Sequence, residues 1–552
     1  MTIRRVSLYL ALGVLAGLSS CGGNGGSSSG GGTNPPPVTP PTTTGGYVVT
    51  AWSELGMHCI DGKDYSVFSV LPPYNTLHAQ VIRIGDPPVI VSGVTVTYQA
   101  MPDTTGSTNV SSSGKTNFWS YVKTLFLATP ASDVGLTGNP VQSATPHAMT
   151  YNSASGYWEA VGIPTIPYDD AGNRNAYPMA KIVAKDSSGN ILGSATAVLA
   201  VSDEMNCATC HASGGSVAAQ PAAGWEYSSD SAKDVKLNIL KKHDDRWPIS
   251  EYLATLKANG YTYQSSLYQT AKSGTPILCA SCHGSNALSA PGLTGIKSLT
   301  ADMHSLHASA INPSSGTTLD NASTPLNSCY LCHPGQQTKC QRGAMNKTAC
   351  YDCHGNLTKV GASTRQGWLD LPSCQMCHMN GTRYTSTFDT NGAWRTSTDL
   401  TFATTPDKPS PGKSLFRFST GHGGVYCSGC HGSQHAEYPS LQANDNAYST
   451  NLQGHAGKIV ECAACHKSAP KTLNGGPHGM HNIDQGWVSQ HRQYAENNRN
   501  QCTYCHGADF RGTVLSAIPV ARSISAGDAG TKTFSAGHQM NCYDCHNGPN
   551  GG

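Results

Sequence analysis

The chain has little charge of either sign, because only 12% of its 552 residues are Asp, Glu, Lys or Arg and their formal sum is +2. This composition excludes a long charged helix bundle, and the lack of a basic excess argues against nucleic-acid binding. Only 7% of residues are aromatic and 38% are hydrophobic, so side chains alone supply little core for so long a chain. The longest apolar run, Val6–Leu18, has 13 residues and is too short for a typical membrane-spanning helix.

Glycine, proline, cysteine and histidine are abundant instead, with 60, 32, 21 and 22 residues. Glycine and proline favour loops over long regular elements. The length predicts two or more domains. We expect four segments, which are an export signal over 1–20, a linker over 21–46, a β-rich domain over 47–201 and a cysteine-rich domain over 202–552.

The first segment has the organisation of an export signal, since two arginines precede its apolar run. Leu18–Cys21 resembles the lipobox of bacterial lipoproteins, which would make Cys21 the lipid attachment site. The alternative is an ordinary secretory signal with a chance cysteine. The Gly/Ser-rich and Pro-rich linker that follows predicts a tether that holds the rest of the chain away from a membrane.

The β-rich segment contains short, mostly β-branched apolar runs separated by turn residues. This pattern predicts an all-β, sandwich-like domain, and the last two runs predict a hairpin across Ser188–Asn190. The five runs are Ala79–Ile84, Val89–Tyr98, Trp119–Leu127, Ala180–Lys185 and Ile191–Val201.

A short cluster near the start of this segment sets His58, Cys59 and Asp61 within four residues. Such a group can ligate a metal or form a reactive thiol, but it has no second half in the sequence. The alternative is a buried cysteine, or one paired with Cys340. The other two histidines of the segment, at positions 78 and 147, are interpreted as core or surface residues.

The motif Cys-x-x-Cys-His occurs nine times after Val201 and uses 18 of the 21 cysteines. The motif starts are separated by 72, 50, 21, 24, 53, 35, 40 and 40 residues, which is not the fixed period of a solenoid. The nine copies are Cys207/Cys210/His211, Cys279/Cys282/His283, Cys329/Cys332/His333, Cys350/Cys353/His354, Cys374/Cys377/His378, Cys427/Cys430/His431, Cys462/Cys465/His466, Cys502/Cys505/His506 and Cys542/Cys545/His546.

This spacing is typical of covalent c-type haem attachment. Two thiols three positions apart reach the two vinyl groups of one haem, and the adjacent histidine reaches the iron from the same side. Zinc sites also use Cys-x-x-Cys and exported proteins use disulfides, but neither requires a histidine directly after each motif. The sequence therefore predicts nine covalently attached c-type haems, each with its motif histidine as the proximal iron ligand.

Ten further histidines in the same region are candidates for the sixth, distal ligand of each iron, and their number predicts nearly complete bis-histidine ligation. A surface imidazole is the alternative for each. Asp230 is expected to cap a helix that ends near His243. His304 and His307, three positions apart, are expected to share a helix face and to serve two haems. The candidates are His243, His304, His307, His422, His435, His455, His478, His481, His491 and His538.

With these motifs, the chain resembles the outer-surface multihaem c-type cytochromes of dissimilatory metal-reducing bacteria. The resemblance covers the export signal and nearly everything after Glu204. It implies a haem-organised cytochrome c domain with short helices and little regular secondary structure behind the all-β domain. Nine haems and one β-rich domain depart from that family's decahaem arrangement with two β-barrels. The segments that carry the resemblance are Glu54–Cys59, Cys279–Leu288, Gly476–His481 and Cys505–Ser516.

The resemblance implies electron transfer in extracellular, anaerobic respiration, with metal oxides or partner cytochromes as acceptors. It also implies an outer-membrane lipoprotein exposed at the cell surface, with a periplasm-facing anchor as the alternative. The β-rich domain is expected to dock another multihaem cytochrome or an outer-membrane porin–cytochrome complex. Two other functions stay open. The protein could be a reductase of a small nitrogen or sulfur oxyanion at one open haem, or a subunit of a cytochrome filament.

Overall fold

The structure is a computed structural model that describes residues 46–379, 382–403 and 415–550. These residues belong to one compact unit, Val38–Gly552. The predictions for the export signal, for Cys21 and for nearly all of the linker lie outside the described residues. No helix in the described part of the chain is long and apolar enough to cross a bilayer.

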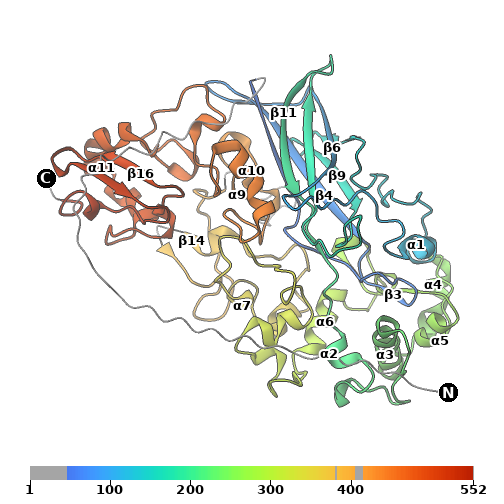
Figure 1. Cartoon of the computed structure of the whole chain (residues 1–552). Coiled ribbons are helices and arrows are strands. Elements are labelled where there is room, and N and C mark those ends of the chain that lie inside the picture. The colour runs from blue at the N-terminus through green and yellow to red at the C-terminus, as the bar shows by residue number, and fades with distance from the viewer. Residues whose placement is uncertain (1–45, 380–381, 404–414, 551–552) are drawn as a thin grey trace, which may run out of the picture. The chain divides into compact units, whose positions relative to one another are not determined.

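The N-terminal region is rich in antiparallel strands, as expected (Figure 1). Its first sheet has the order β1-β4-β9-β8, and β5 pairs with β4 outside this order. The long strand β4 is buried along almost its whole length, including its polar residues Asn75, Thr76, His78 and Gln80. The five strands are β1 (Tyr47–Ser53), β4 (Tyr74–Arg83), β5 (Val89–Val91), β8 (Thr150–Asn152) and β9 (Tyr157–Pro164).

The second sheet has the order β11-β10-β6-β7, again antiparallel. The predicted hairpin is confirmed, because β10 pairs with β11 across the turn. The Asp186 carboxylate accepts hydrogen bonds from the backbone N–H groups of Ser188 and Asn190, which closes this turn. The four strands are β6 (Thr95–Met101), β7 (His147–Ala148), β10 (Met179–Lys185) and β11 (Ile191–Val198).

The prediction of a strand over Trp119–Leu127 is wrong, because this segment forms the helix α1 (Phe118–Phe126). Its buried residues Phe118, Val122 and Leu125 recur at intervals of four and three, which is the period of a helix. The aromatic and β-branched composition favoured a strand, and the period of the buried positions decides the outcome.

Side chains from both sheets share one hydrophobic core, in which Leu77, Tyr98 and Trp158 are buried. Two tyrosines from much later in the chain, Tyr438 and Tyr448, belong to the same core. The strands therefore do not close their core with residues 47–201 alone.

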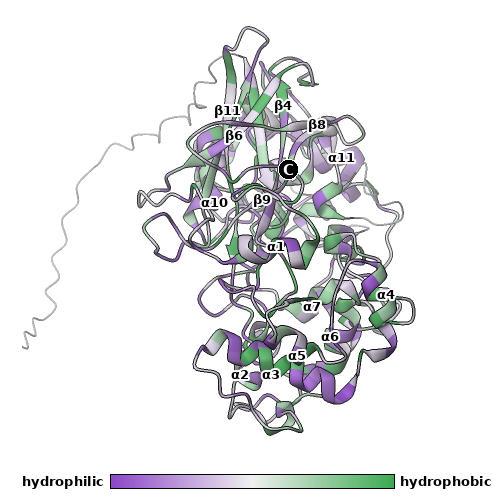
Figure 2. Ribbon diagram, turned by 90° about the vertical axis from the view of Figure 1, so that its right-hand side faces the viewer, coloured by the Kyte–Doolittle hydropathy of each residue, from purple (hydrophilic) through white to green (hydrophobic). Residues whose placement is uncertain are grey.

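After β12 (Val201–Ser202) the chain forms mostly short helices and irregular structure (Figure 1). Hydrophobic and hydrophilic residues alternate along helices such as α3 and α5, and their apolar residues share a second core (Figure 2). The helices are α2 (Ala208–His211), α3 (Ser231–Arg246), α4 (Leu253–Ala258), α5 (Leu267–Lys272), α6 (Leu299–His307), α7 (Cys350–His354), α8 (Leu357–Val360), α9 (Cys427–His431), α10 (Ala443–Gln453) and α11 (Gln485–His506).

Short strands join this region to the N-terminal part of the chain. β12 pairs in parallel with β2 (His58–Cys59), and β13 (Ile277–Leu278) pairs in parallel with β3 (Phe68–Ser69). Two small hairpins lie further along, β14 (His378–Met379) with β15 (Thr382–Arg383) and β16 (Arg522–Ser525) with β17 (Thr531–Phe534).

Candidate haem sites

Each Cys-x-x-Cys-His motif forms a single helical turn or the last turn of a helix. In the first motif, for example, the backbone N–H groups of Cys210 and His211 both donate to the carbonyl of Cys207, at 3.2 and 2.9 Å. A helical turn sets positions i, i+3 and i+4 on one face. The backbone therefore presents both thiols and the imidazole of a motif to the same side.

No disulfide joins any of the cysteines among the described residues. Cys59 and Cys340 are therefore not joined in a disulfide. Groups of three or more His, Cys, Asp or Glu side chains that suit a metal ion do not occur in the described part of the chain.

The cluster around Cys59 is a buried structural feature. The His58 ring is buried and lies against the Tyr74 ring, with centroids 4.2 Å apart. The Asp61 carboxylate accepts hydrogen bonds from the Ser69 hydroxyl and the Val70 backbone N–H, at 2.6 and 2.8 Å. Burial raises the pKa of the Cys59 thiol, which removes the thiolate that a reactive cysteine needs.

Eight of the nine motif histidines face a histidine from outside the motifs, and each partner is used once. The ring centroids of these pairs lie 5.8–6.5 Å apart. The pairs are His211–His307, His283–His243, His333–His304, His354–His435, His466–His422, His431–His478, His506–His481 and His546–His491.

These distances leave room for one atom between the two rings of a pair. An imidazole nitrogen binds a metal at about 2 Å and the ring centre lies about 1 Å further, so two axial imidazoles of one iron have centres about 6 Å apart. The eight pairs match this value. The donor set therefore fits bis-histidine haem, with two thiols and one imidazole from each motif and a second imidazole from elsewhere in the chain.

Hydrogen bonds orient many of these rings. Nδ1 of His304 donates to the Thr300 carbonyl at 2.8 Å, and Nδ1 of His506 donates to the Met540 carbonyl at 2.8 Å. A donor Nδ1 leaves Nε2 with its free lone pair, which is the usual arrangement of a metal-binding histidine. The same Nδ1-to-carbonyl bond occurs at His283, His307, His478, His481, His491 and His546.

Burial also keeps several of the paired rings neutral. It lowers the pKa of His354 and of His431 to about 3, and that of His435 to about 4. Only the neutral imidazole offers a lone pair to a metal, so these rings are in the binding form near neutral pH.

The remaining candidates face other groups. Nε2 of His455 lies 3.2 Å from the Glu461 carboxylate, and Nε2 of His538 lies 2.9 Å from the Asp544 carboxylate. Neither ring faces a motif histidine. One motif histidine, His378 of the fifth motif, has no such partner. Its ring contacts Phe402, at a centroid distance of 5.5 Å.

One continuous cavity of about 2830 Å³ links most of the motifs. All three motif residues of the first seven motifs line it, together with Cys505 of the eighth. A pocket for one ligand has about 300–1,000 Å³, so this space suits several large ligands in contact with one another.

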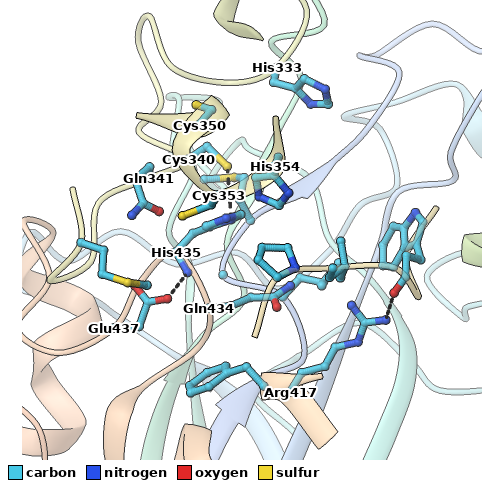
Figure 3. A pocket seen from close by; sticks show the side chains of 18 of the residues that line it. His333, Cys340, Gln341, Cys350, Cys353, His354, Arg417, Gln434, His435 and Glu437 are labelled. Carbon is cyan, nitrogen blue, oxygen red and sulfur yellow. Dashed lines mark hydrogen bonds between the residues drawn. The ribbon is translucent and has the colours of Figure 1, made fainter. Parts of the chain in front are cut away.

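Residues around the paired histidines include Glu437, which the sequence did not single out, and Cys340, which it singled out only as a possible partner of Cys59. The close-up of His435 in Figure 3 shows it beside His354, with Cys340 and Glu437 around it. Sγ of Cys340 lies 3.8 Å from Nδ1 of His435, and the His435 backbone N–H donates to the Glu437 carboxylate at 2.7 Å. The one available sequence signal was that Cys340 belongs to no motif.

Comparison of the chain with protein-family models, curated proteins and solved structures gave no match.

Proposed function

We propose that this protein is a nonahaem c-type cytochrome that transfers electrons. The observation that carries the proposal is the set of eight imidazole pairs at 5.8–6.5 Å, each with one ring from a Cys-x-x-Cys-His motif. The motif thiols would hold each haem covalently, and the paired imidazoles would occupy both axial positions. Haem supplies reversible one-electron chemistry when bound.

Two helices support transfer between neighbouring sites. α6 carries His304 and His307, which face the histidines of two different motifs. α11 carries His491 near its start and the complete eighth motif at its end. Each of these helices thus carries parts of two sites, and α11 has a kink at Asn498 between its two parts.

A contact between the third and fourth motifs also supports electron transfer between neighbouring sites. The Cys329 and Cys350 thiols lie near each other, and their interaction lowers the pKa of Cys329. The third and fourth motifs therefore lie side by side. Because the chain closes eight sites with imidazole on both sides, we infer that these sites carry electrons and do not bind substrate.

The cellular setting rests on the sequence. A lipid on Cys21 would anchor the protein to the outer membrane, and the linker would hold the haem region away from the bilayer. We infer that the two antiparallel sheets form a sandwich that docks a partner cytochrome or a porin–cytochrome complex. Extracellular metal oxides or partner cytochromes would accept the electrons.

The first test is a haem count of the exported holoprotein by pyridine haemochrome absorbance and by intact mass. We expect nine covalent haems with low-spin ferric spectra for at least eight of them. A protein that contains zinc or disulfides and no covalent haem would contradict the proposal.

A second test addresses the pairing. The variant His491→Ala should keep all nine haems and gain one high-spin ferric signal in electron paramagnetic resonance (EPR), because it removes one axial imidazole. The matched control is His538→Ala, whose ring faces Asp544 and no motif histidine. Equal high-spin signals in the two variants would show that the pairs do not define the axial ligands.

The anchor is tested separately. Cys21→Ala should abolish incorporation of labelled fatty acid and release the protein from membranes, with its haem content unchanged. Continued lipid labelling of this variant would contradict lipidation at Cys21.

A further inference from the structure

The Cys374–His378 motif differs from the other eight in what its histidine faces. All 22 histidines of the chain lie among the described residues. Eight of those outside the motifs face other motif histidines, and none of the described rings that contact His378 is an imidazole. Its ring contact is Phe402, whose side chain has no atom able to bind iron.

The neighbouring imidazole is already engaged. The Phe402 ring contacts both His378 and His478, with centroids 5.5 Å from the first and 5.4 Å from the second. His478 itself faces His431 at 5.8 Å, and its Nδ1 donates to the Thr401 carbonyl at 3.0 Å. His478 is therefore already engaged with His431 and Thr401 and is not a spare partner for His378.

The two spare imidazoles are held elsewhere. Nδ1 of His455 is 2.9 Å from the Ala456 carbonyl and its Nε2 faces Glu461. The ring of His538 stacks on Phe534 at 4.8 Å while its Nε2 faces Asp544. A shift of either ring to His378 would have to break these contacts.

The surroundings of His378 are positively charged. Arg383 is the residue opposite His378 in the β14–β15 hairpin, and both Arg383 and Lys458 line the same cavity as His378. Cationic side chains in a water-poor cavity attract small anions. The cavity reaches Thr385 and Thr387, whose hydroxyls add polar character to its wall.

We propose that the site at His378 leaves one axial iron position open, that Phe402 lines this open position, and that the position binds a small anion. This inference rests on the proposed function, because it requires a haem held by Cys374 and Cys377. It adds a ligand-binding site to a protein whose other eight sites are closed by imidazole.

The test uses the ferric holoprotein and cyanide as the probe anion. With nine haems counted, we expect a high-spin EPR signal worth about one haem in nine, which cyanide converts to low spin. Nine haems that are all low-spin and unaffected by cyanide would overturn the inference and leave the proposed function intact. A protein without covalent haem would fail the proposed function instead.

Variants locate the site. Cys374→Ala/Cys377→Ala should leave eight haems and remove the cyanide-sensitive signal, and persistence of that signal with eight haems would overturn the assignment to His378. In the holoprotein with all nine motifs, Phe402→His should lower the high-spin signal and slow cyanide binding at least tenfold. Phe402→Leu, which adds no iron ligand, is the matched control and should keep the high-spin signal that Phe402→His loses. Identical binding by the two Phe402 variants would overturn the placement of Phe402 at the open position.

Discussion

Histidine residues of this chain meet three kinds of environment. Most lie in imidazole pairs, two face carboxylates, and His78 lies in the strand region among aromatic rings. The His78 ring stacks on Trp52 at a centroid distance of 5.8 Å and meets Tyr157 edge-on at 4.5 Å. Neither of its nitrogens has a hydrogen-bond partner among the described residues. Burial, together with the positive charge of Arg417, lowers its pKa to about 3.

This environment predicts a loss of stability in acid. The unfolded chain binds a proton at His78 near the usual pKa of about 6.5, whereas the folded chain resists it until about pH 3. The contribution of neutral His78 is therefore complete above pH 6.5 and is lost as the pH falls from there toward 3. His58, which burial holds at a pKa of about 4, acts in the same direction.

The variant His78→Phe keeps an aromatic ring and removes the titration. Its unfolding free energy, measured by urea denaturation, should fall less between pH 7 and pH 5 than that of the parent. The control is His147→Phe at the edge strand β7, where the ring is only half-buried, and this variant should follow the parent more closely. Equal acid sensitivity of His78→Phe and the parent would contradict the assignment.

A buried arginine connects the motif region with the strand region. The Arg342 side chain is 1% exposed, and its Nε and Nη2 donate to the two Asp445 carboxylate oxygens at 2.7 and 3.0 Å. Its Nη1 donates to the Gly56 carbonyl at 2.6 Å. One guanidinium thus joins three segments that are far apart in the sequence.

Removal of this guanidinium should be costly. Arg342→Ala leaves the Asp445 carboxylate buried without its partner, which costs about 3–5 kcal/mol. Arg492→Ala is the control, because Arg492 pairs with Glu496 at the surface and such a pair contributes about 0.5 kcal/mol or less. Urea denaturation of the two holoprotein variants checks this difference, and similar losses in both would contradict it.

At the scale of elements, helix α3 shows how local sequence sets a site. The Asp230 carboxylate accepts hydrogen bonds from the N–H groups of Ala232 and Lys233, at 3.0 and 3.2 Å, and so caps the helix as its sequence predicted. His243 lies in the last turn and faces His283. The cap therefore stabilises the element that presents this imidazole.

Asp230→Ala should destabilise the helix by about 1 kcal/mol, whereas Asp230→Ser, which can still cap, should lose much less. Hydrogen exchange of the first turn of α3 should rise about fivefold in the alanine variant. An unchanged exchange rate would show that packing, and not the cap, holds this turn.

The two helices α1 and α3 show where sequence patterns succeed and fail. Capping by Asp230 is a local interaction, so the sequence predicts it directly. The segment from Trp119 to Leu127 has strand-forming residues, but its buried positions follow a helical period that becomes visible only when the core is known. The hairpin of β10 and β11 is predicted because its turn chemistry is local as well.

The pairing of histidines, unlike the helix cap and the hairpin turn, does not depend on local sequence. The motifs identify one imidazole of each pair, whereas partners such as His478 for His431 come from distant segments. Sequence spacing gives no information on contacts of this range, so the sequence predicts the number of candidates and not the pairs. It also gives no sign that His378 faces Phe402, because that depends on where two loops meet.

At the scale of the whole molecule, the strand region and the motif region share a core. Tyr448, on α10, is 4% exposed and packs with strand residues such as Tyr98 and Ala197. Removal of the Tyr448 ring should therefore destabilise both the strand region and the motif region.

Tyr448→Ala should lower the unfolding free energy by about 3–5 kcal/mol, because it removes a large buried ring. Tyr448→Phe keeps the ring and should lose less than about 1.5 kcal/mol. Hydrogen exchange mapped along the chain should show faster exchange in both β11 and α10 of the alanine variant. Faster exchange confined to α10 would show that the two regions are not coupled.

The shared core also sets an order for biosynthesis. A chain that emerges from its N-terminus exposes the strands first, but the tyrosines that complete their core follow about 250 residues later. We expect the strand surfaces and most of the motif cysteines to stay accessible together until that late segment arrives. Enzymes that act on the unfolded thiols therefore have the longest time at the earliest motif, Cys207–His211, and the shortest at the motifs that emerge after the core can close.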